Sequence, residues 1–314
     1  IAMTNGTVAL FCCLKSLGIG PGDEVIVPDM TFIATSNSVI MAGATPVFCD
    51  IKLDDMSLDV EKVKECITNK TKAIMPVHLY GGAANIKELK RVCEEFNLFL
   101  VEDAAQGVGV KYDGKHVGTF GDLGILSFYG NKTITCGEGG VVLTDDDDLA
   151  ASCYRLKNHG RDTKGVFVHS HIGFNFAFTE MQAAIGIAQL NKLEKIISRK
   201  KEIYDRYVLS LSEIEGLRPL VFEENISPVY WFTSFFTNER ASLAKHLDDN
   251  KIQTRQFFYP LHKQPCYGFM GLDCESFPNS SQSFEEGISL PSSYNLTESQ
   301  QDYIISCIKD YYKK

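Results

Sequence analysis

Short β-branched and apolar runs alternate with amphipathic helical patterns over the first half of the chain. The expected strands are residues 24–28, 45–49, 72–77, 98–102, 125–128 and 140–144. Helical patterns lie between several of them, at residues 8–17, 59–67 and 86–96. Strands that are apolar on both faces and separated by helices predict a mostly parallel sheet covered on both sides. We therefore expect an α/β fold in this region.

The second half has a different pattern. A long helical repeat over residues 179–209 is expected to bridge two domains. After it come shorter strands at 230–237 and 252–258 and helices at 241–249 and 297–312, which is typical of an α+β arrangement. Residues 265–283 are rich in Gly, Ser, Pro and Asn and are expected to form a surface loop. We predict a large α/β domain over 1–200 and a small C-terminal α+β domain over 201–314.

Composition narrows the class of partner. The chain has 31 Lys and Arg against 40 Asp and Glu, a formal net charge of −9, so we expect no nucleic-acid partner. No apolar run approaches the roughly 20 residues of a membrane span, so we expect none. The ten cysteines form no C-x-x-C pair or Cys/His ligand set, which predicts reduced thiols, no metal site and a cytoplasmic location. Because the chain opens at Ile1 without an initiator methionine, we expect it to be a piece of a longer protein.

Two segments place polar groups where α/β sheets bind ligands. Residues 5–7 (Asn-Gly-Thr) precede a helical pattern whose first amides can bind an anion, although such a segment is more often a plain helix cap. Glu102 and Asp103 follow a buried strand at the ligand-binding edge of the sheet. A carboxylate there either pairs with a cation such as a protonated heterocyclic nitrogen or is a solvated acid at a strand end.

Lys132 lies between a buried strand and a glycine-rich turn, within residues 127–140 (SFYGNKTITCGEGG). A desolvated lysine amine has a lowered pKa and can attack carbonyl groups, whereas most lysines are solvated surface residues. The glycines allow either close backbone approach to a ligand or a hairpin. These residues alone leave both interpretations open.

Taken in order, five segments resemble the DegT/DnrJ/EryC1/StrS family of sugar aminotransferases. They are residues 5–7, 28–32 (PDMTF), 102–106 (EDAAQ), 127–132 (SFYGNK) and 173–175 (GFN). The joint match spans nearly the whole chain, and residues 73–82 (AIMPVHLYGG) resemble most the perosamine-forming branch. The resemblance implies a fold type I transferase dependent on pyridoxal 5′-phosphate, similar to aspartate aminotransferase. It further implies a homodimer with active sites shared between subunits.

The resemblance also implies residue roles. Lys132 would hold the cofactor as a Schiff base and move the proton between substrate and cofactor, and Asp103 would pair with the pyridinium nitrogen. Phe32 would stack on the cofactor ring, and Gln106 would approach its phenolic oxygen. The groups expected to bind the cofactor phosphate are the amides of Gly6 and Thr7, the Ser127 hydroxyl and Asn175 from the other subunit.

The implied reaction is a ping-pong transamination. L-Glutamate donates the amine, and a nucleotide-linked 4-keto-6-deoxyhexose accepts it at C4, giving a perosamine- or viosamine-type product. The candidate donors to the sugar nucleotide's pyrophosphate are Arg161, Lys157 and Arg255. The side chains that could line the sugar pocket are His78, His159, His169, His171, His262, Tyr80, Tyr230, Trp231 and Tyr259. His262 is the strongest of these, because the family places a substrate-side histidine in this loop.

Three departures from the family pattern bear on specificity. Relatives carry a further segment before residues 5–7, and many have a basic residue two positions after Asn175, where this chain has Ala177. Tyr259 stands where the perosamine relatives have a histidine. The last two departures can change the hexose or the nucleotide, so GDP, UDP and dTDP carriers all stay open.

Other classes of protein remain as alternatives. A dehydratase of the same family would have histidine in place of Lys132. A binding or regulatory protein would keep the fold without turnover. A dinucleotide-dependent oxidoreductase would need a G-x-G-x-x-G turn after the first strand, which this sequence lacks.

Overall fold

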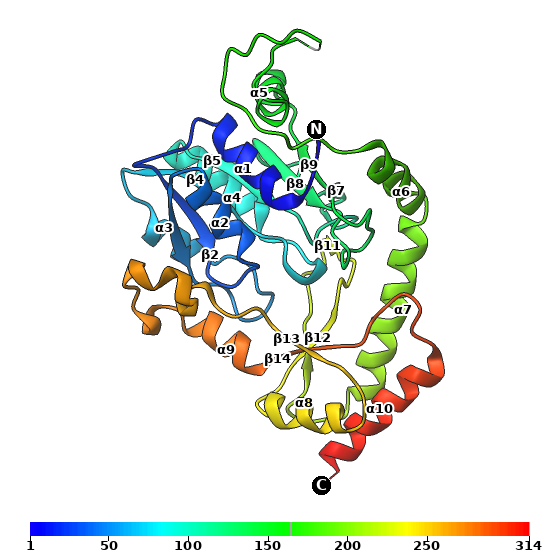
Figure 1. The fold of residues 1–314 in the computed structure, drawn as a ribbon. Coiled ribbons are helices and arrows are strands. Elements are labelled where there is room, and N and C mark those ends of the chain that lie inside the picture. Colours follow the sequence, from blue (N-terminus) through cyan, green and yellow to red (C-terminus); the bar gives the residue numbers. More distant parts are fainter. Residues whose placement is uncertain (164, 314) are drawn as a thin grey trace.

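The computed structural model describes residues 1–163 and 165–313, and its largest element is a seven-stranded sheet (Figure 1). The strand order is β1-β9-β8-β5-β4-β2-β3. The parallel strands are β2 (Glu24–Pro28), β3 (Thr45–Cys49), β4 (Thr71–Ile74), β5 (Phe99–Asp103) and β8 (Leu123–Ser127). The antiparallel strands β9 (Gly140–Leu143) and β1 (Ala2–Met3) extend the sheet beyond β8. The predicted α/β class is confirmed.

Helices cover both faces of this sheet. They are α1 (Gly6–Ser16), α2 (Ala34–Met41), α3 (Val60–Cys66), α4 (Ile86–Phe96) and α5 (Asp147–Lys157). Successive side chains of a strand point to opposite faces, so Val25 packs in one cluster with Leu14 of α1, whereas Ile26 packs in another with Leu89 of α4. Both faces are therefore apolar, as a sandwiched parallel sheet requires.

The prediction of one helix over residues 179–209 was wrong at a single point. The structure has α6 (Glu180–Leu190) and α7 (Leu193–Leu211), separated at Asn191 and Lys192. Both helices have apolar residues at helical spacing, so the repeat continues across the break and conceals it. None of the residues of α6 is buried within the chain, whereas α7 buries Ile203 and Tyr207.

A four-stranded antiparallel sheet forms the second layered unit. Its order is β10 (Arg218–Pro219), β12 (Thr233–Phe236), β14 (Gly287–Leu290) and β13 (Arg255–Gln256). Helices α8 (Arg240–Asp249) and α10 (Glu298–Tyr312) pack against this sheet. Leu243 of α8 and Ile308 of α10 lie in one apolar cluster with Phe235 of β12. The remaining strands, β11 (Ile226–Ser227), β6 (Lys111–Tyr112) and β7 (Lys115–His116), form a separate three-stranded sheet.

The expected loop at 265–283 is partly helical. The structure has the short 3-10 helices Leu261–Lys263, Pro265–Met270 and Cys274–Ser276, followed by α9 (Pro278–Glu286). The first turn of α9 is capped from elsewhere in the chain, because the Asp50 carboxylate accepts hydrogen bonds from the N–H groups of Asn279 (3.0 Å) and Ser280 (2.9 Å). Local composition cannot reveal such a cap.

A second carboxylate holds the same segment. Asp29 directly follows β2, as Asp50 follows β3, and its two oxygens bind His262: the backbone N–H donates at 2.7 Å and Nδ1 lies 2.6 Å away. Residues 261–280 are thus attached to the large sheet at two neighbouring strand ends.

The division between domains lies along α7. Ile196 packs with Val108 and Ile134, whereas Ile203 and Tyr207 pack with the small antiparallel sheet. This change of partner agrees with our proposal of a boundary at residue 200 between domains 1–200 and 201–314. Within 201–314, however, β11 pairs with β6, and Leu261 and Tyr267 pack in the cluster of the large sheet. Across residues 1–163 and 165–313, none of the helices has the length and apolar character needed to cross a membrane.

Candidate active site

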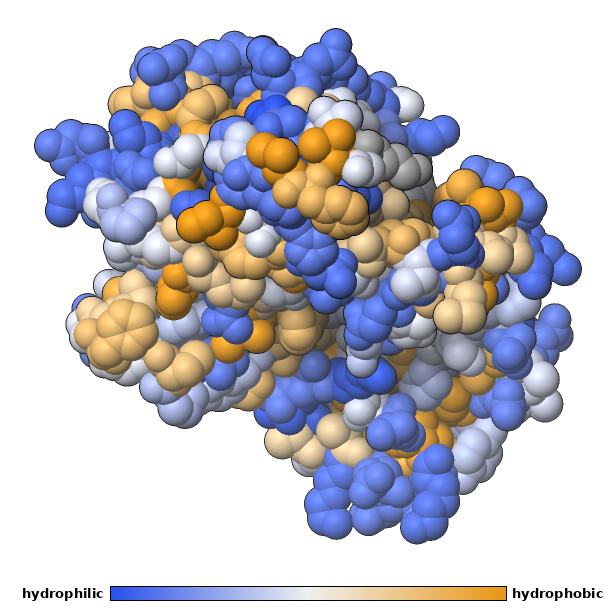
Figure 2. Space-filling model, turned by 45° about the horizontal axis from the view of Figure 1, so that its top comes forward, coloured by the Kyte–Doolittle hydropathy of each residue, from blue (hydrophilic) through white to orange (hydrophobic). Residues whose placement is uncertain are grey.

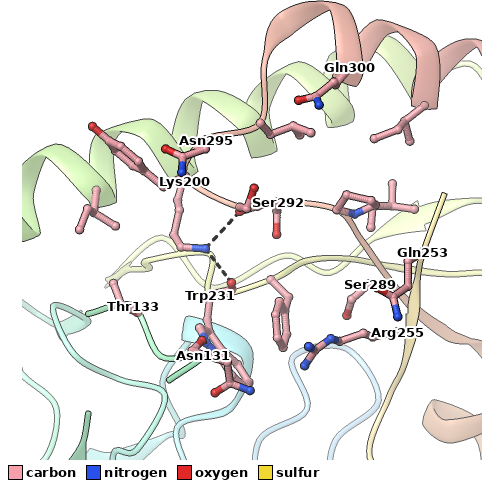
Figure 3. Close-up of a pocket in the computed structure, with 18 of the residues that line it drawn as sticks. Asn131, Thr133, Lys200, Trp231, Gln253, Arg255, Ser289, Ser292, Asn295 and Gln300 are labelled. Carbon is pink, nitrogen blue, oxygen red and sulfur yellow. Dashed lines mark hydrogen bonds between the residues drawn. The ribbon is translucent and has the colours of Figure 1, made fainter. Parts of the chain in front are cut away.

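The carboxyl ends of β5 and β8 bring the two principal candidates to one edge of the sheet. Asp103 is the last residue of β5, and Lys132 follows β8 by five residues. The two strands are neighbours, with Asp103 opposite Ile125. Lys132 lines a cavity of about 1440 Å³. Other walls of this cavity come from α7 and the small sheet, as Lys200 and Ser289 show in Figure 3.

The Lys132 amine is poorly hydrated and faces an aromatic ring. Its burial lowers the pKa to about 8, although the nearby Asp103 carboxylate acts in the opposite direction. Nζ lies 4.5 Å from the centroid of the Trp231 indole. The indole Nε1 donates a hydrogen bond to the Asn131 carbonyl at 2.7 Å, so Trp231 also fixes the loop that carries the lysine.

Asp103 is 4% exposed and is oriented by two donors. The Thr35 hydroxyl donates to Oδ2 at 2.8 Å, and the Ala105 N–H donates to Oδ1 at 3.1 Å. Burial raises the pKa of Asp103, while these hydrogen bonds and Lys132 lower it and only partly offset burial. A buried carboxylate in this state is ready to pair with a cationic group on a ligand.

Glu102 points to the opposite face and has a structural role. It accepts hydrogen bonds from the backbone of Gly118 (2.7 Å), Phe120 (2.6 Å) and Gly121 (2.7 Å) and lies 3.0 Å from His78 Nε2. Burial raises its pKa, but these hydrogen bonds outweigh burial and hold it below the ordinary value. His78 Nδ1 accepts from the Ala84 N–H, so the ring is fully engaged and is not part of the Lys132 cavity. This placement corrects the suggestion that His78 lines the sugar pocket.

The start of α1 forms a corner with the end of β8. Asn5 caps the helix by accepting from the Val8 N–H at 3.0 Å. The amides of Gly6 and Thr7 lie in the first turn, where no carbonyl one turn earlier can accept from them. A Cβ on Gly6 would lie 3.2 Å from the Cβ and 3.4 Å from the Oγ of Ser127. The structure therefore brings Gly6, Thr7 and Ser127 together.

The two residues expected beside the cofactor ring differ in exposure. The Phe32 ring is 54% exposed and lies 6.1 Å from the ring of Phe258. Gln106 is 3% exposed, and its Oε1 accepts from the backbone N–H of Tyr80 at 2.7 Å. Tyr80 is itself buried, stacks on Phe257 at 4.6 Å and accepts from the Phe258 N–H.

The predicted substrate-side residues are divided between two regions. Arg255 lines the cavity of Lys132, with its guanidinium 5.3 Å from the Phe232 ring. Tyr259 is 42% exposed and packs edge-on against Phe284. His262 is buried on Asp29, and its Nε2 has no hydrogen-bond partner within the described residues.

Arg161 and Asn175 lie in the loop after α5, apart from the lining of the Lys132 cavity. Arg161 donates to Asn158 Oδ1 at 2.9 Å. Asn175 is exposed and pairs with Asn158 through a β-bridge. In a single chain, Asn175 therefore presents its side chain outward.

Several weaker candidates already have partners within the chain. Lys157 donates to the Ala2 carbonyl at 2.7 Å, and His169 Nδ1 lies 2.7 Å from the carbonyl of His159. Tyr230 stacks on Tyr204 at 3.8 Å, while His171 lies against Ser170.

Sequence reasoning missed Thr35 and Lys200. Thr35 follows Thr31 by one helical turn and reaches Asp103 from α2, a helix that no periodic pattern indicated. Lys200 is 9% exposed, and its Nζ donates to the carbonyls of Trp231 (2.9 Å) and Ser292 (3.3 Å) (Figure 3). Its position between apolar residues of α7 is the one signal that the sequence offered.

The parallel sheet, with the lysine on the loop after β8 and an acid at the end of β5, has the fold type I architecture of aminotransferases. The structure of DesV from Streptomyces venezuelae matches 100% of this chain and 85% of its own with a TM-score of 0.96 and 33% identity. The PLP form of Spr1654 from Streptococcus pneumoniae matches 100% and 86% with a TM-score of 0.93 and 28% identity.

Sequence comparison is more specific. The DegT/DnrJ/EryC1/StrS aminotransferase family matches residues 1–309, and this chain belongs to that family. A relative from Vibrio cholerae named GDP-perosamine synthase is 42% identical over 99% of this chain and 85% of its own length. The resemblance read from the five short segments is confirmed.

Proposed function

We propose that this chain is a pyridoxal-phosphate-dependent aminotransferase that moves the amino group of L-glutamate to the C4 keto carbon of a nucleotide-linked 4-keto-6-deoxyhexose. The observation that carries the proposal is the poorly hydrated Lys132 amine, with a pKa of about 8, close to the buried Asp103 carboxylate. The similarity to GDP-perosamine synthase supports the choice of substrate class and favours a GDP carrier.

The chain's own groups fit this cofactor. The corner of Gly6, Thr7 and Ser127 offers two free amides and a hydroxyl to a phosphate, and any side chain at position 6 would press on Ser127. Asp103 supplies the counter-charge that a protonated ring nitrogen needs. Phe32 has an exposed ring available for stacking. The donor set therefore matches a ligand with an anion at one end and a cationic ring nitrogen at the other.

When bound, pyridoxal phosphate supplies an electron-accepting ring to the carbon that exchanges its amine. Thr35 and the Ala105 N–H hold the Asp103 carboxylate in place, so that Asp103 keeps the proton on the ring nitrogen. Lys132 takes a proton from the donor carbon with its neutral amine, a form that burial favours by lowering the pKa of this amine. The same amine returns the proton in the second half of the reaction. The Trp231 indole excludes water from one side of Nζ.

The proposed assembly is a homodimer with shared active sites. Large apolar side chains are exposed on the loop after α5 and on α6: Phe167 (81%), Val168 (73%), Ile172 (88%), Met181 (77%) and Ile187 (63%). Figure 2, which turns the top of the molecule forward, shows hydrophobic residues at the surface of this face. Such patches mark protein contacts. The exposed Asn175 in the same loop is then available to the neighbouring cofactor phosphate.

All ten cysteines are free thiols, in keeping with a cytoplasmic location.

The test is an absorbance spectrum of the protein with pyridoxal phosphate, before and after L-glutamate and then GDP-4-keto-6-deoxymannose. We expect glutamate to convert the bound cofactor to its amine form and the keto sugar to reverse the change. Asp103→Asn is expected to retain the cofactor weakly and to react at least a hundredfold more slowly. The matched control is Asp205→Asn, an exposed acid on α7. A spectrum that glutamate leaves unchanged would instead favour the binding or regulatory alternative.

A further inference from the structure

The cavity of Lys132 is strongly basic although the chain is acidic. Among the described residues, its lining has six basic side chains and no carboxylate: Lys132, Lys192, Lys195, Lys200, Lys251 and Arg255. The whole chain has a net charge of −9, so this cluster is a local reversal of the molecule's charge. Low-dielectric walls of a single sign concentrate the field in a cleft and attract ions of the opposite sign.

The outer cations of this cavity have no acidic partner. Lys192, Lys195, Lys251 and Arg255 make no ion pair within 4.0 Å in the described part of the chain, and all four are exposed. Some cations outside the cavity do pair with carboxylates, such as Lys87 with Asp113 and Lys201 with Asp205, while others such as Lys52 and Lys111 do not within the residues that the structure describes. The cavity is therefore distinguished by six cations in one described lining without a carboxylate, not by the missing ion pairs alone. Neighbouring unpaired cations repel one another, and a bound anion would relieve that repulsion.

The secondary structure strengthens this positive field. Lys192 is the N-cap of α7 and Lys195 lies in its first turn, where the helix dipole disfavours cations. Ser299 and Gln300 bring the first turn of the 15-residue helix α10 to the same cavity. Glu194 lies in the first turn of α7 but is not part of the lining. The N-terminus of α10 is already closed by a capping box between Thr297 and Gln300, so the N-terminus of α7 and the unpaired cations carry most of the positive field in this cavity.

Lys200 does not share this role. Its amine already donates to the Trp231 and Ser292 carbonyls, as Figure 3 shows, so two of its three donors are engaged. Arg255 and the exposed lysines keep their donors free. The cavity of about 1440 Å³ is also larger than a hexose needs, so it has room for more than the reacting sugar.

We propose that Lys192, Lys195, Lys251 and Arg255 form the binding site for the diphosphate of the substrate's nucleotide carrier, an inference that rests on the proposed function. Because Lys132 lines the same cavity, a diphosphate held on these cations leaves the attached sugar free to extend toward the reacting amine. The site recognises two linked phosphate groups, whichever base the nucleotide carries. Arg161 and Lys157, the other basic candidates, lie outside this lining.

The test measures binding of inorganic pyrophosphate, GDP and guanosine to the cofactor-loaded full chain by isothermal titration calorimetry. We expect the double variant Lys192→Gln/Lys195→Gln to bind pyrophosphate and GDP at least tenfold more weakly, with a smaller dependence on salt. Guanosine binding should not change. The matched control is Lys201→Gln, which removes the same charge from the same helix at a residue paired with Asp205 (2.6 Å) outside the cavity. We expect less than a twofold effect from it.

Three outcomes would overturn the inference. The wild-type protein could fail to bind pyrophosphate, the double variant could bind it normally, or Lys201→Gln could weaken binding as much as the double variant. The last result would show that net charge, not this site, attracts the anion. The glutamate reaction of the wild-type protein is recorded on the same sample. If that reaction fails while the two cavity lysines still control pyrophosphate binding, the proposed function is wrong and the anion site remains.

Discussion

Two lysines lie beside Trp231, and they differ in what their amines can do. Burial lowers the pKa of both Lys132 and Lys200 to about 8. The Lys200 amine donates to two backbone carbonyls, whereas Lys132 makes no hydrogen bond within the described residues and faces the Trp231 ring and the Asp103 charge. A lowered pKa thus reports lost hydration only. The free donors and the nearby carboxylate distinguish a reactive lysine from a structural one.

Replacing Lys132 should give the largest effect. Lys132→Met keeps the aliphatic stem but removes the amine, so we expect the glutamate reaction to slow by at least about 10³-fold with the fold intact. Stopped-flow absorbance measures the rate. Borohydride treatment of the cofactor-loaded wild type should attach the cofactor to Lys132 alone, as peptide mass spectrometry can determine. Attachment of the cofactor to Lys200 instead would show that Lys200, not Lys132, is the reactive lysine.

Lys200→Met should act mainly on stability. Two buried carbonyls lose their donor, so the free energy of unfolding is expected to fall by about 2 kcal/mol, while the glutamate rate falls by less than about tenfold. Urea denaturation measures the first quantity. Lys201→Met, on the exposed face of the same helix, serves as control and should change stability by less than about 0.5 kcal/mol. A Lys200 variant that is inactive yet fully stable would contradict the structural role.

Trp231→Phe separates the ring from its N–H. The variant keeps an aromatic face near Lys132 but loses the hydrogen bond to the Asn131 carbonyl. We expect about a tenfold slower glutamate reaction, because the loop that carries Lys132 is held less firmly. A second readout is the pKa of the Lys132 amine in the cofactor-free chain, which should rise above about 8 as the amine gains water. An unchanged rate and an unchanged pKa would remove the loop-fixing role.

The pH dependence of stability should show both lysines. Their pKa values are about 8 in the folded chain and near the ordinary 10.5 when unfolded, so the unfolded state binds more protons between these values. Stability should therefore rise with pH across this window. Each Met variant should remove part of the rise, by about 1 kcal/mol after allowance for the partial exposure of Lys132. Thermal unfolding from pH 7 to 10.5 measures this, and parallel curves for the wild type and both variants would refute it.

Residues that follow a strand in the sequence were the predictable part of the site. Asp103 ends the strand β5 and Lys132 follows the strand β8 by five residues, and the six expected strands correspond to β2, β3, β4, β5, β8 and β9. The roles of these residues remain predictions, but their convergence at one sheet edge follows from parallel strand order. Alternation along β5 also separates Glu102 from Asp103, which the run of two acids alone did not reveal.

Contacts between distant segments were not predictable. Thr35 reaches Asp103 across 68 positions, and Asp50 caps α9 across 229 positions. Neither pairing leaves a local pattern, because each partner looks like an ordinary polar residue in its own window. The break between α6 and α7 escaped for a different reason, since an apolar repeat cannot show that one helix is buried by its own chain and the other is not.

The attachment of residues 261–280 to Asp29 and Asp50 has a mechanical consequence. Each carboxylate holds a different part of this segment: Asp29 binds the turn at His262, and Asp50 binds the first turn of α9. Replacing one of them would therefore free one end of the segment while the other end stays attached to the large sheet.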